Sequence, residues 1–278
     1  MKRVICVAGF LCGAAAWAFV STPKVGMVRC SDGAVYALLG LHANFVAGQR
    51  AFSLAQAASF SDQAGLVASD GRLMLIGSDG SVQATYFEGE ASPVINVDGD
   101  QSSAVAWLPR RSELLTWAGN QFDVVPVQSD ALKGLVTGVR LVSEGSVELL
   151  VTQSDNSVDR VTVSVPGGMV TDLSAISGAA GVAFVQQSFL LFHDSNGLEV
   201  QAANGIVRTL PISQSDLTFE RIGADWVHIS STSAQRDWVL HLNQTALELS
   251  ELPQLVQQTP FSSPRRSPEP PRTVARPE

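Results

Sequence analysis

Short apolar runs alternate with polar turns along most of the chain. Between Gly33 and Gln254, a run such as 65–68 is followed by a turn, a second run such as 73–76 and another turn. Many turns hold an Asp-Gly or Asn-Gly pair, which tolerates the positive φ of a tight hairpin loop. These pairs are Asp32-Gly33, Asp70-Gly71, Asp79-Gly80, Asp98-Gly99, Asn196-Gly197 and Asn204-Gly205. The pattern predicts successive antiparallel hairpins and an all-β fold.

The apolar runs recur at a spacing that indicates a repeated unit. Equivalent runs start at positions 33, 65, 104, 147, 181 and 225, so the mean period is roughly 40 residues. Units of three or four short strands with this period are typical of propeller blades. The sequence therefore predicts a β-propeller of six short antiparallel blades over residues 28–254. We expect its first and last strands to close the ring by pairing in one blade.

Other architectures explain the pattern less well. Two β-sandwiches of about 100 residues each would need a linker that the middle of the chain lacks, and sustained helical periodicity is absent. The third unit shows the β pattern clearly, with expected strands at 104–108, 113–117 and 122–127. Near the end, Thr245 has capping-box spacing and allows a helix toward Gln258. The alternation around Leu247 and the later Pro253 favour a closing strand instead.

The blade period resembles that of the β-propeller superfamily, in particular WD-repeat and YVTN-type proteins, over roughly residues 28–254. The Gly-His and Trp-Asp pairs of true WD repeats are missing, because Asp225-Trp226 and Asp237-Trp238 have the reversed order. The chain is also similar to secreted bacterial propeller proteins. This resemblance implies a fold and carries no activity with it.

The N-terminal segment has the features of an export signal. A basic pair, Lys2-Arg3, precedes an apolar stretch over 4–20, and Ala16-Trp17-Ala18 offers a small-x-small cleavage site. We expect residues 1–18 to be a signal peptide and the mature protein to be periplasmic or secreted. The alternative is an uncleaved membrane anchor, for which the apolar stretch is at the short limit.

The C-terminal segment differs in composition from the rest of the chain. Residues 255–278 are rich in proline and arginine and poor in apolar side chains. Such a segment buries too little apolar area to offset its ordering entropy. We expect a disordered tail there, after a propeller domain at 28–254.

Charge narrows the range of partners. The net charge is −8, and acidic side chains outnumber basic ones within 25–254. Nucleic-acid binding depends on Lys and Arg contacts to phosphates, so this body predicts no nucleic-acid partner. Anionic membrane surfaces would repel it too, and we expect no stable membrane insertion of the mature chain. We expect a monomer that binds a protein or an envelope component.

The positions of the three cysteines argue against a disulfide in the mature protein. Cys6 and Cys12 lie inside the predicted signal, so only Cys30 remains in the mature chain. No intramolecular disulfide is then possible, and the fold depends on its apolar core. We interpret Cys30 as a small buried residue beside the first strand rather than a reactive thiol.

The sequence contains no recognisable catalytic or metal motif. The nucleophile elbow Gly-x-Ser-x-Gly, phosphate-binding loops and the His-Glu-x-x-His metal motif do not occur. We therefore assign no catalytic residues, metal ligands or cofactor. Asn96, Asp98 and Asp100 alternate like calcium ligands, but the positions that follow do not match an EF-hand.

Four residues remain as binding candidates. Arg110 and Arg111 lie in a predicted loop, and arginine is favoured at interface hot spots; the alternative is that they only solvate a turn. Trp226 and His228 alternate on one strand and share a face, as a sugar-stacking platform would require; the alternative is packing between blades. The sequence predicts an exported non-enzymatic binding scaffold, and the alternative is a propeller-type carbohydrate-active hydrolase or lyase.

Overall fold

The computed structural model describes residues 23–41, 44–87, 89, 92–128, 130 and 132–252. The predicted signal peptide at 1–18 and the predicted tail at 255–278 lie outside these residues. The described chain is all-β, as predicted. Within it, no helix has the length and apolar character needed to cross a membrane.

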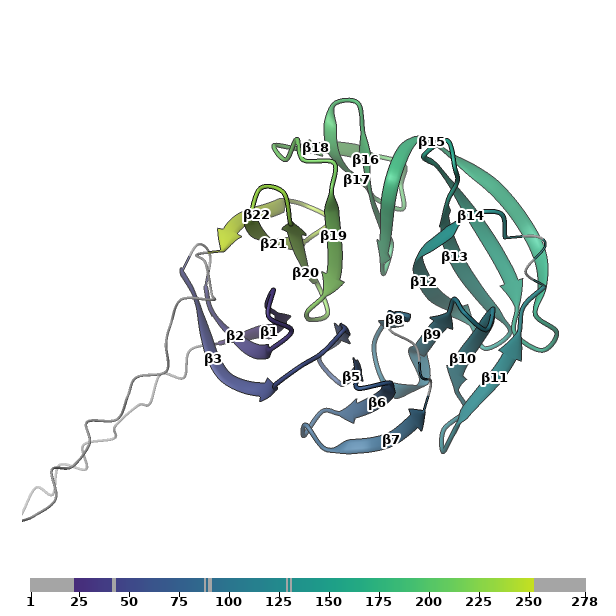
Figure 1. Cartoon of the computed structure of the whole chain (residues 1–278). Helices are drawn as coiled ribbons and strands as arrows, with labels where there is room; N and C mark the ends of the chain where they lie inside the picture. The colour runs from purple at the N-terminus through teal and green to yellow at the C-terminus, as the bar shows by residue number, and fades with distance from the viewer. Residues whose placement is uncertain are drawn as a thin grey trace, which may run out of the picture.

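Five antiparallel sheets, each a simple meander, are arranged around a common centre (Figure 1). The three-stranded first sheet contains β1 (Lys24–Arg29), β2 (Val35–Leu41) and β3 (Asn44–Phe52). The next sheet contains β4 (Ala57–Phe60), β5 (Ala64–Ser69), β6 (Arg72–Gly77) and β7 (Val82–Phe87). The third contains β8 (Val94–Val97), β9 (Ala104–Leu108), β10 (Glu113–Trp117) and β11 (Phe122–Pro126), with a 3-10 turn η1 (Gln101–Ser103) before β9.

The second half of the chain forms one large sheet and one small one. The seven-stranded sheet contains β12 (Leu135–Ser143), β13 (Ser146–Thr152), β14 (Ser157–Ser164), β15 (Met169–Gln186), β16 (Phe189–Asp194), β17 (Gly197–Gln201) and β18 (Val207–Leu210). The last sheet contains β19 (Leu217–Arg221), β20 (Trp226–Ser231), β21 (Arg236–Leu242) and β22 (Leu247–Leu252). The closing segment at 247–252 is thus a strand, and the helical alternative is wrong there.

Inner strands of four sheets form a ring about the centre. β4 contacts β8, β8 contacts β12, β12 contacts β15, β15 contacts β19, and β19 contacts β4. The first sheet lies between the last sheet and the second, where β1 contacts β4 and β20 (Figure 1). The arrangement is that of a β-propeller, which confirms the predicted architecture.

The predicted count of six blades is not supported. The described residues form five hydrogen-bonded sheets, because the 18-residue strand β15 pairs with β14 through its first half and with β16 through its second half. Two sequence units therefore share one sheet. Gly178 and Gly181, both at positive φ, lie where β15 passes from one neighbour to the other.

The expected closure by strand pairing is also wrong for the described residues. β1 pairs with β2 and β22 pairs with β21, each within its own sheet. We call the boundary between the first sheet and the last sheet the seam. A backbone hydrogen bond joins its two sides, from Met27 N to Ile222 O at 2.8 Å.

Apolar side chains fill the boundaries between neighbouring sheets. Ten buried residues fill the boundary between the second and third sheets: Ala64, Leu66, Ala68, Leu73, Leu75, Val97, Ala104, Ala106, Leu108 and Leu115. At the seam the buried apolar residues are Val25, Val28, Leu38, Phe45, Ile222, Val239 and Leu252. Burial of this apolar area is the main stabilising contribution to the fold.

Candidate functional site

The two predicted binding pairs lie on different sheets. Arg110 and Arg111 occupy the β9–β10 turn of the third sheet, whereas Trp226 and His228 belong to β20 of the last sheet. Arg111 lies 3.9 Å from the Glu113 carboxylate, and its guanidinium donates to the Tyr86 hydroxyl at 3.4 Å. The structure thus presents two separate candidate surfaces.

Trp226 and His228 face the seam together. Trp226 stacks on His241 with 4.3 Å between ring centroids. It also meets Phe45 edge to face, with 6.0 Å between ring centroids. Because neighbouring side chains of the two sheets pack on the indole, the packing interpretation describes Trp226 well. His228 is buried and belongs to a polar cluster.

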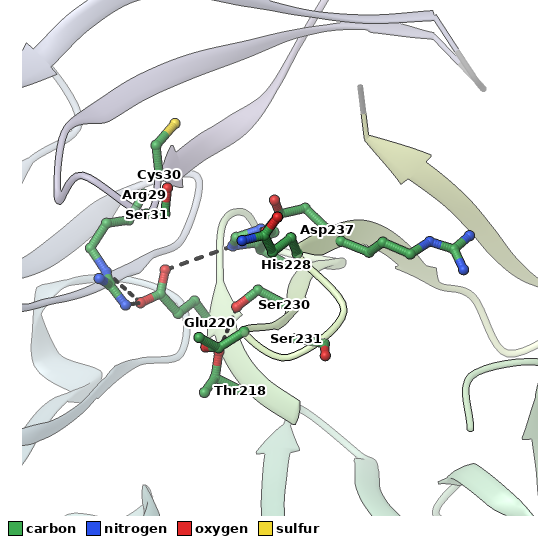
Figure 2. Close-up of a pocket in the computed structure, with 12 residues that line it drawn as sticks. Arg29, Cys30, Ser31, Thr218, Glu220, His228, Ser230, Ser231 and Asp237 are labelled. Carbon is green, nitrogen blue, oxygen red and sulfur yellow. Dashed lines mark hydrogen bonds and ion pairs between the residues drawn. The ribbon is translucent and has the colours of Figure 1, made fainter. Parts of the chain in front are cut away.

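That cluster lines a cavity of about 520 Å³ at the seam. Glu220 of β19 accepts a hydrogen bond from Arg29 Nε at 2.6 Å, and its other oxygen lies 3.8 Å from His228 Nδ1. The opposite ring nitrogen of His228 lies 2.9 Å from the Asp237 carboxylate. Figure 2 shows this chain of contacts crossing from the first sheet to the last.

The cluster changes the charge state of His228. Burial lowers the pKa of the imidazole, but hydrogen bonds and charge interactions with Asp237 and Glu220 outweigh burial and raise the pKa to about 8. His228 is therefore mostly protonated at neutral pH and carries a positive charge between two carboxylates. With Arg29 it balances their charge, so the cluster connects the two sheets electrostatically.

Cys30 lines the same cavity without belonging to this chain of contacts. The thiol is free and buried, and burial together with nearby carboxylates, Asp32 first, raises its pKa to about 11. A protonated thiol is a poor nucleophile. In Figure 2 the sulfur points away from the Glu220 carboxylate. The geometry agrees with the interpretation of Cys30 as a small buried residue.

Inner strands enclose a small central cavity of about 180 Å³. Its lining is mostly apolar or small and includes Ala57, Ala58, Val94, Ile95, Gly138, Phe184 and Phe219, with Glu220 at one side. A channel of this composition offers packing surface and few groups for acid–base chemistry.

A second cavity, of about 380 Å³, opens at one end of this channel. Its lining brings together the β4–β5, β8–β9, β15–β16 and β19–β20 turns. We call this end of the propeller the β4–β5 end. The opposite end carries the β9–β10 and β20–β21 turns, because each strand separates its two flanking turns.

Arg221 organises the β4–β5 end. It is 2% exposed, pairs with Asp98 and donates to the carbonyl oxygens of Gly223 at 3.1 Å and Ala224 at 2.9 Å. The Asp62 carboxylate accepts from Ala224 N at 3.1 Å. These bonds fix turns from three sheets against one another. Because Asp98 pairs with Arg221, its carboxylate is not available as the second of the three calcium ligands considered from the sequence.

Sequence reasoning missed the most connected of these residues. Arg221 and Asp98 are 123 positions apart and Arg29 and Glu220 are 191 positions apart, so no local motif links them. The short spacing of Trp226 and His228 was a local signal that pointed to the seam. Among the described residues, no group of three or more His, Cys, Asp or Glu side chains is placed to hold a metal ion.

Comparisons with known proteins add only distant structural likeness. No known family and no curated protein matches the chain. Three solved structures align at a TM-score of 0.44. PorZ, an essential surface component of the type-IX secretion system of Porphyromonas gingivalis, is 11% identical and aligns over 84% of this chain, which spans 38% of the PorZ chain. BBS1N in complex with ARL6DN is 15% identical, and the alignment covers 80% of this chain and 79% of the BBS1N chain. Kuenenia stuttgartiensis hydrazine synthase is 10% identical, and the alignment covers 85% of this chain and 81% of the hydrazine synthase chain.

Proposed function

We propose that this protein is an exported, non-enzymatic β-propeller that binds a protein or an envelope component through the turns of its β4–β5 end. The observation that carries the proposal is that three cavities meet at one turn. Ser61 and Asp62 line both the cavity of about 380 Å³ at this end and a cavity of about 440 Å³ between the first and second sheets. Gln63 lines the cavity of about 380 Å³ and a further groove.

Such a surface suits recognition because it is concave and rigidly supported. Turns vary without loss of the sheets that hold them, and binding groups are found there more often than on strands. The Asp98–Arg221 pair and the Asp62–Ala224 bond restrain the turns before any ligand arrives. A preorganised surface loses less entropy on binding.

Affinity capture from the native envelope fraction tests this function. Replacing Gln63 with arginine places a bulky cation where the cavities meet, and we expect loss of partner capture with an unchanged melting temperature. The matched comparison is Arg110→Ala with Arg111→Ala at the opposite end. If that pair abolishes capture and Gln63→Arg does not, recognition lies at the β9–β10 turn and the proposed surface is wrong.

Export is tested separately by the mass of the mature protein. The basic start, apolar stretch and Ala16-Trp17-Ala18 site predict an N-terminus near Phe19. Retention of residues 1–18 in the extracytoplasmic protein would favour the anchor alternative.

A carbohydrate-active hydrolase is the second candidate, because two carboxylates line one groove. Asp79 and Asp100 both face the groove that Gln63 borders. A glycosidase needs one carboxyl with a raised pKa as proton donor. Hydrogen bonds from the side chain and backbone of Ser81 instead lower the pKa of Asp79. Asp79 is therefore a poor proton donor at neutral pH, so a hydrolase in this groove would need Asp100 as its proton donor.

A further inference from the structure

An open groove of about 690 Å³ lies at the β4–β5 end between the second and third sheets. Its walls come from the β4–β5, β6–β7, β8–β9 and β10–β11 turns and the strands beside them. The side chain of Gln63 lines both this groove and the cavity of about 380 Å³ at the β4–β5 end, so the two hollows are neighbours.

Trp117 provides the aromatic surface of this groove. It is the last residue of β10 and is partly buried. The ring meets Phe122 in an edge-to-face contact at 5.2 Å, and Phe122 meets Tyr86 in the same way at 6.2 Å. These neighbours hold the indole in place, while its position in the groove lining leaves part of it accessible. A fixed aromatic ring is a stacking surface for a flat ligand face.

Side chains around Trp117 carry hydrogen-bonding groups of both kinds. Gln63, Gln83 and Gln101 line the groove, and each amide has two donor hydrogens and an acceptor oxygen. Gln83 Nε2 donates to Ser81 Oγ at 2.6 Å, which orients its amide. Ligand hydroxyl groups both donate and accept, so they match such a lining.

Two carboxylates give the groove a negative charge. Asp79 and Asp100 each accept from the backbone N–H two residues ahead, in both cases at 2.9 Å, so their positions are fixed by the turns. The described lining holds no lysine or arginine. An anionic ligand would be repelled there, whereas carboxylates bind neutral hydroxyl groups well.

We infer that this groove binds a neutral glycan, with a sugar ring against Trp117 and its hydroxyl groups on the glutamine amides and aspartate carboxylates. The inference deepens the proposed binding function, on which it rests, by naming the ligand class. A peptide would favour apolar pockets for its side chains, and Trp117 is the single large apolar side chain in the described lining.

Titration calorimetry of the purified protein with neutral linear hexasaccharides tests the inference. Cello-, chito- and maltohexaose serve as probes, and hexagalacturonate is the anionic comparison. We expect at least one neutral probe to bind and hexagalacturonate not to bind. Replacing Trp117 with alanine should weaken binding at least about tenfold, since it removes the ring against which the sugar packs.

Two further variants keep the test independent of folding. Gln101→Ala removes an amide at the rim without touching the core, and we expect a several-fold loss of affinity with an unchanged melting temperature. Phe87→Ala removes an aromatic ring that is 68% exposed on β7 and outside the groove lining, and binding should be unchanged. Equal losses for Phe87→Ala and Trp117→Ala would overturn the inference.

Glycan binding and partner capture together distinguish a failure of this inference from a failure of the proposed binding function. If no neutral probe binds but Gln63→Arg still abolishes capture of a protein partner, the glycan is wrong and the binding function stands. If neither capture nor glycan binding occurs, both are wrong. Mass spectrometry of the incubated probe should show intact hexasaccharide; shortened products would replace binding with hydrolysis.

Discussion

The seam and the boundary between the second and third sheets are both contacts between neighbouring sheets, but different side chains fill them. The latter is filled by leucine, alanine and valine side chains that exclude water. At the seam, apolar packing around Val28 and Leu38 gives way to the polar cavity with Arg29, Glu220 and His228. Sheets that follow one another in the chain are joined by apolar contact. Sheets from the two ends of the domain are joined partly by charge.

This difference has an energetic consequence. Buried apolar contacts contribute to stability over a wide range of pH and salt, whereas ion pairs depend on both and must offset the desolvation of their charges. We expect the seam to be the weaker boundary and the one that responds to solution conditions. Four predictions test this comparison, from the largest expected effect to the smallest.

Leu66→Ala should cause the largest loss. Leu66 is 0% exposed within the apolar boundary, and truncation of a buried leucine costs about 2–5 kcal/mol through lost transfer energy and a residual cavity. Urea unfolding at two pH values measures it, and the loss should be the same at both. Leu66→Met is the control, because it conserves volume and should cost less than about 1.5 kcal/mol.

Gly26→Ala should cause the next largest loss, at the seam itself. A Cβ at Gly26 would lie 1.7 Å from Ile222 O, so the two sheets would have to separate. Overpacking against backbone costs about 1–3 kcal/mol. The adjacent Met27–Ile222 hydrogen bond should weaken as well, and hydrogen exchange at Met27 N–H should become faster.

Gly145→Ala is the matched control for this prediction. Gly145 has no positive φ and no atom within 4 Å of an added Cβ. It should leave stability unchanged within a few tenths of a kcal/mol. Equal losses at both glycines would show that Gly26 is not required by the close approach of the two sheets.

Local sequence predicts some of these elements and misses others. Strands at 104–108 and 113–117 were predicted with the observed bounds, because turn chemistry and alternation act over a few residues. A run starting at 181 was predicted as the beginning of a new unit, but the continuous strand β15 that passes through it was missed, since no local signal shows that both halves belong to one strand. Two prominent ion pairs of the site were missed too, because contacts across more than 100 positions depend on the ring as a whole.

His228 should make the stability of the seam depend on pH. Its pKa is raised from 6.5 to about 8 in the folded protein, so the stabilisation is fully present below pH 6.5 and is lost as pH rises through 8. A shift of this size corresponds to on the order of 2 kcal/mol. Urea unfolding between pH 6 and pH 9 should show this loss in the native protein.

His228→Gln isolates that contribution. It replaces the titrating ring with a neutral amide, so the difference in unfolding free energy between native protein and variant should shrink as pH rises. The Cys30 thiol also affects stability above pH 9, but it is common to both proteins and cancels in the difference. A difference that stays constant over this range would show that His228 does not couple charge to folding.

Arg236→Gln should have the smallest effect, although it also breaks an ion pair of the last sheet. Arg236 pairs with Glu251 through a bidentate contact and lies over the Trp238 ring at 5.1 Å, yet both charged side chains are about half exposed. Water already solvates such charges, so exposed pairs contribute little. We expect a melting temperature equal to that of the native protein at low and at high salt. A salt-dependent loss as large as that of His228→Gln would mean that exposure, which separates these two ion pairs, does not determine their contribution.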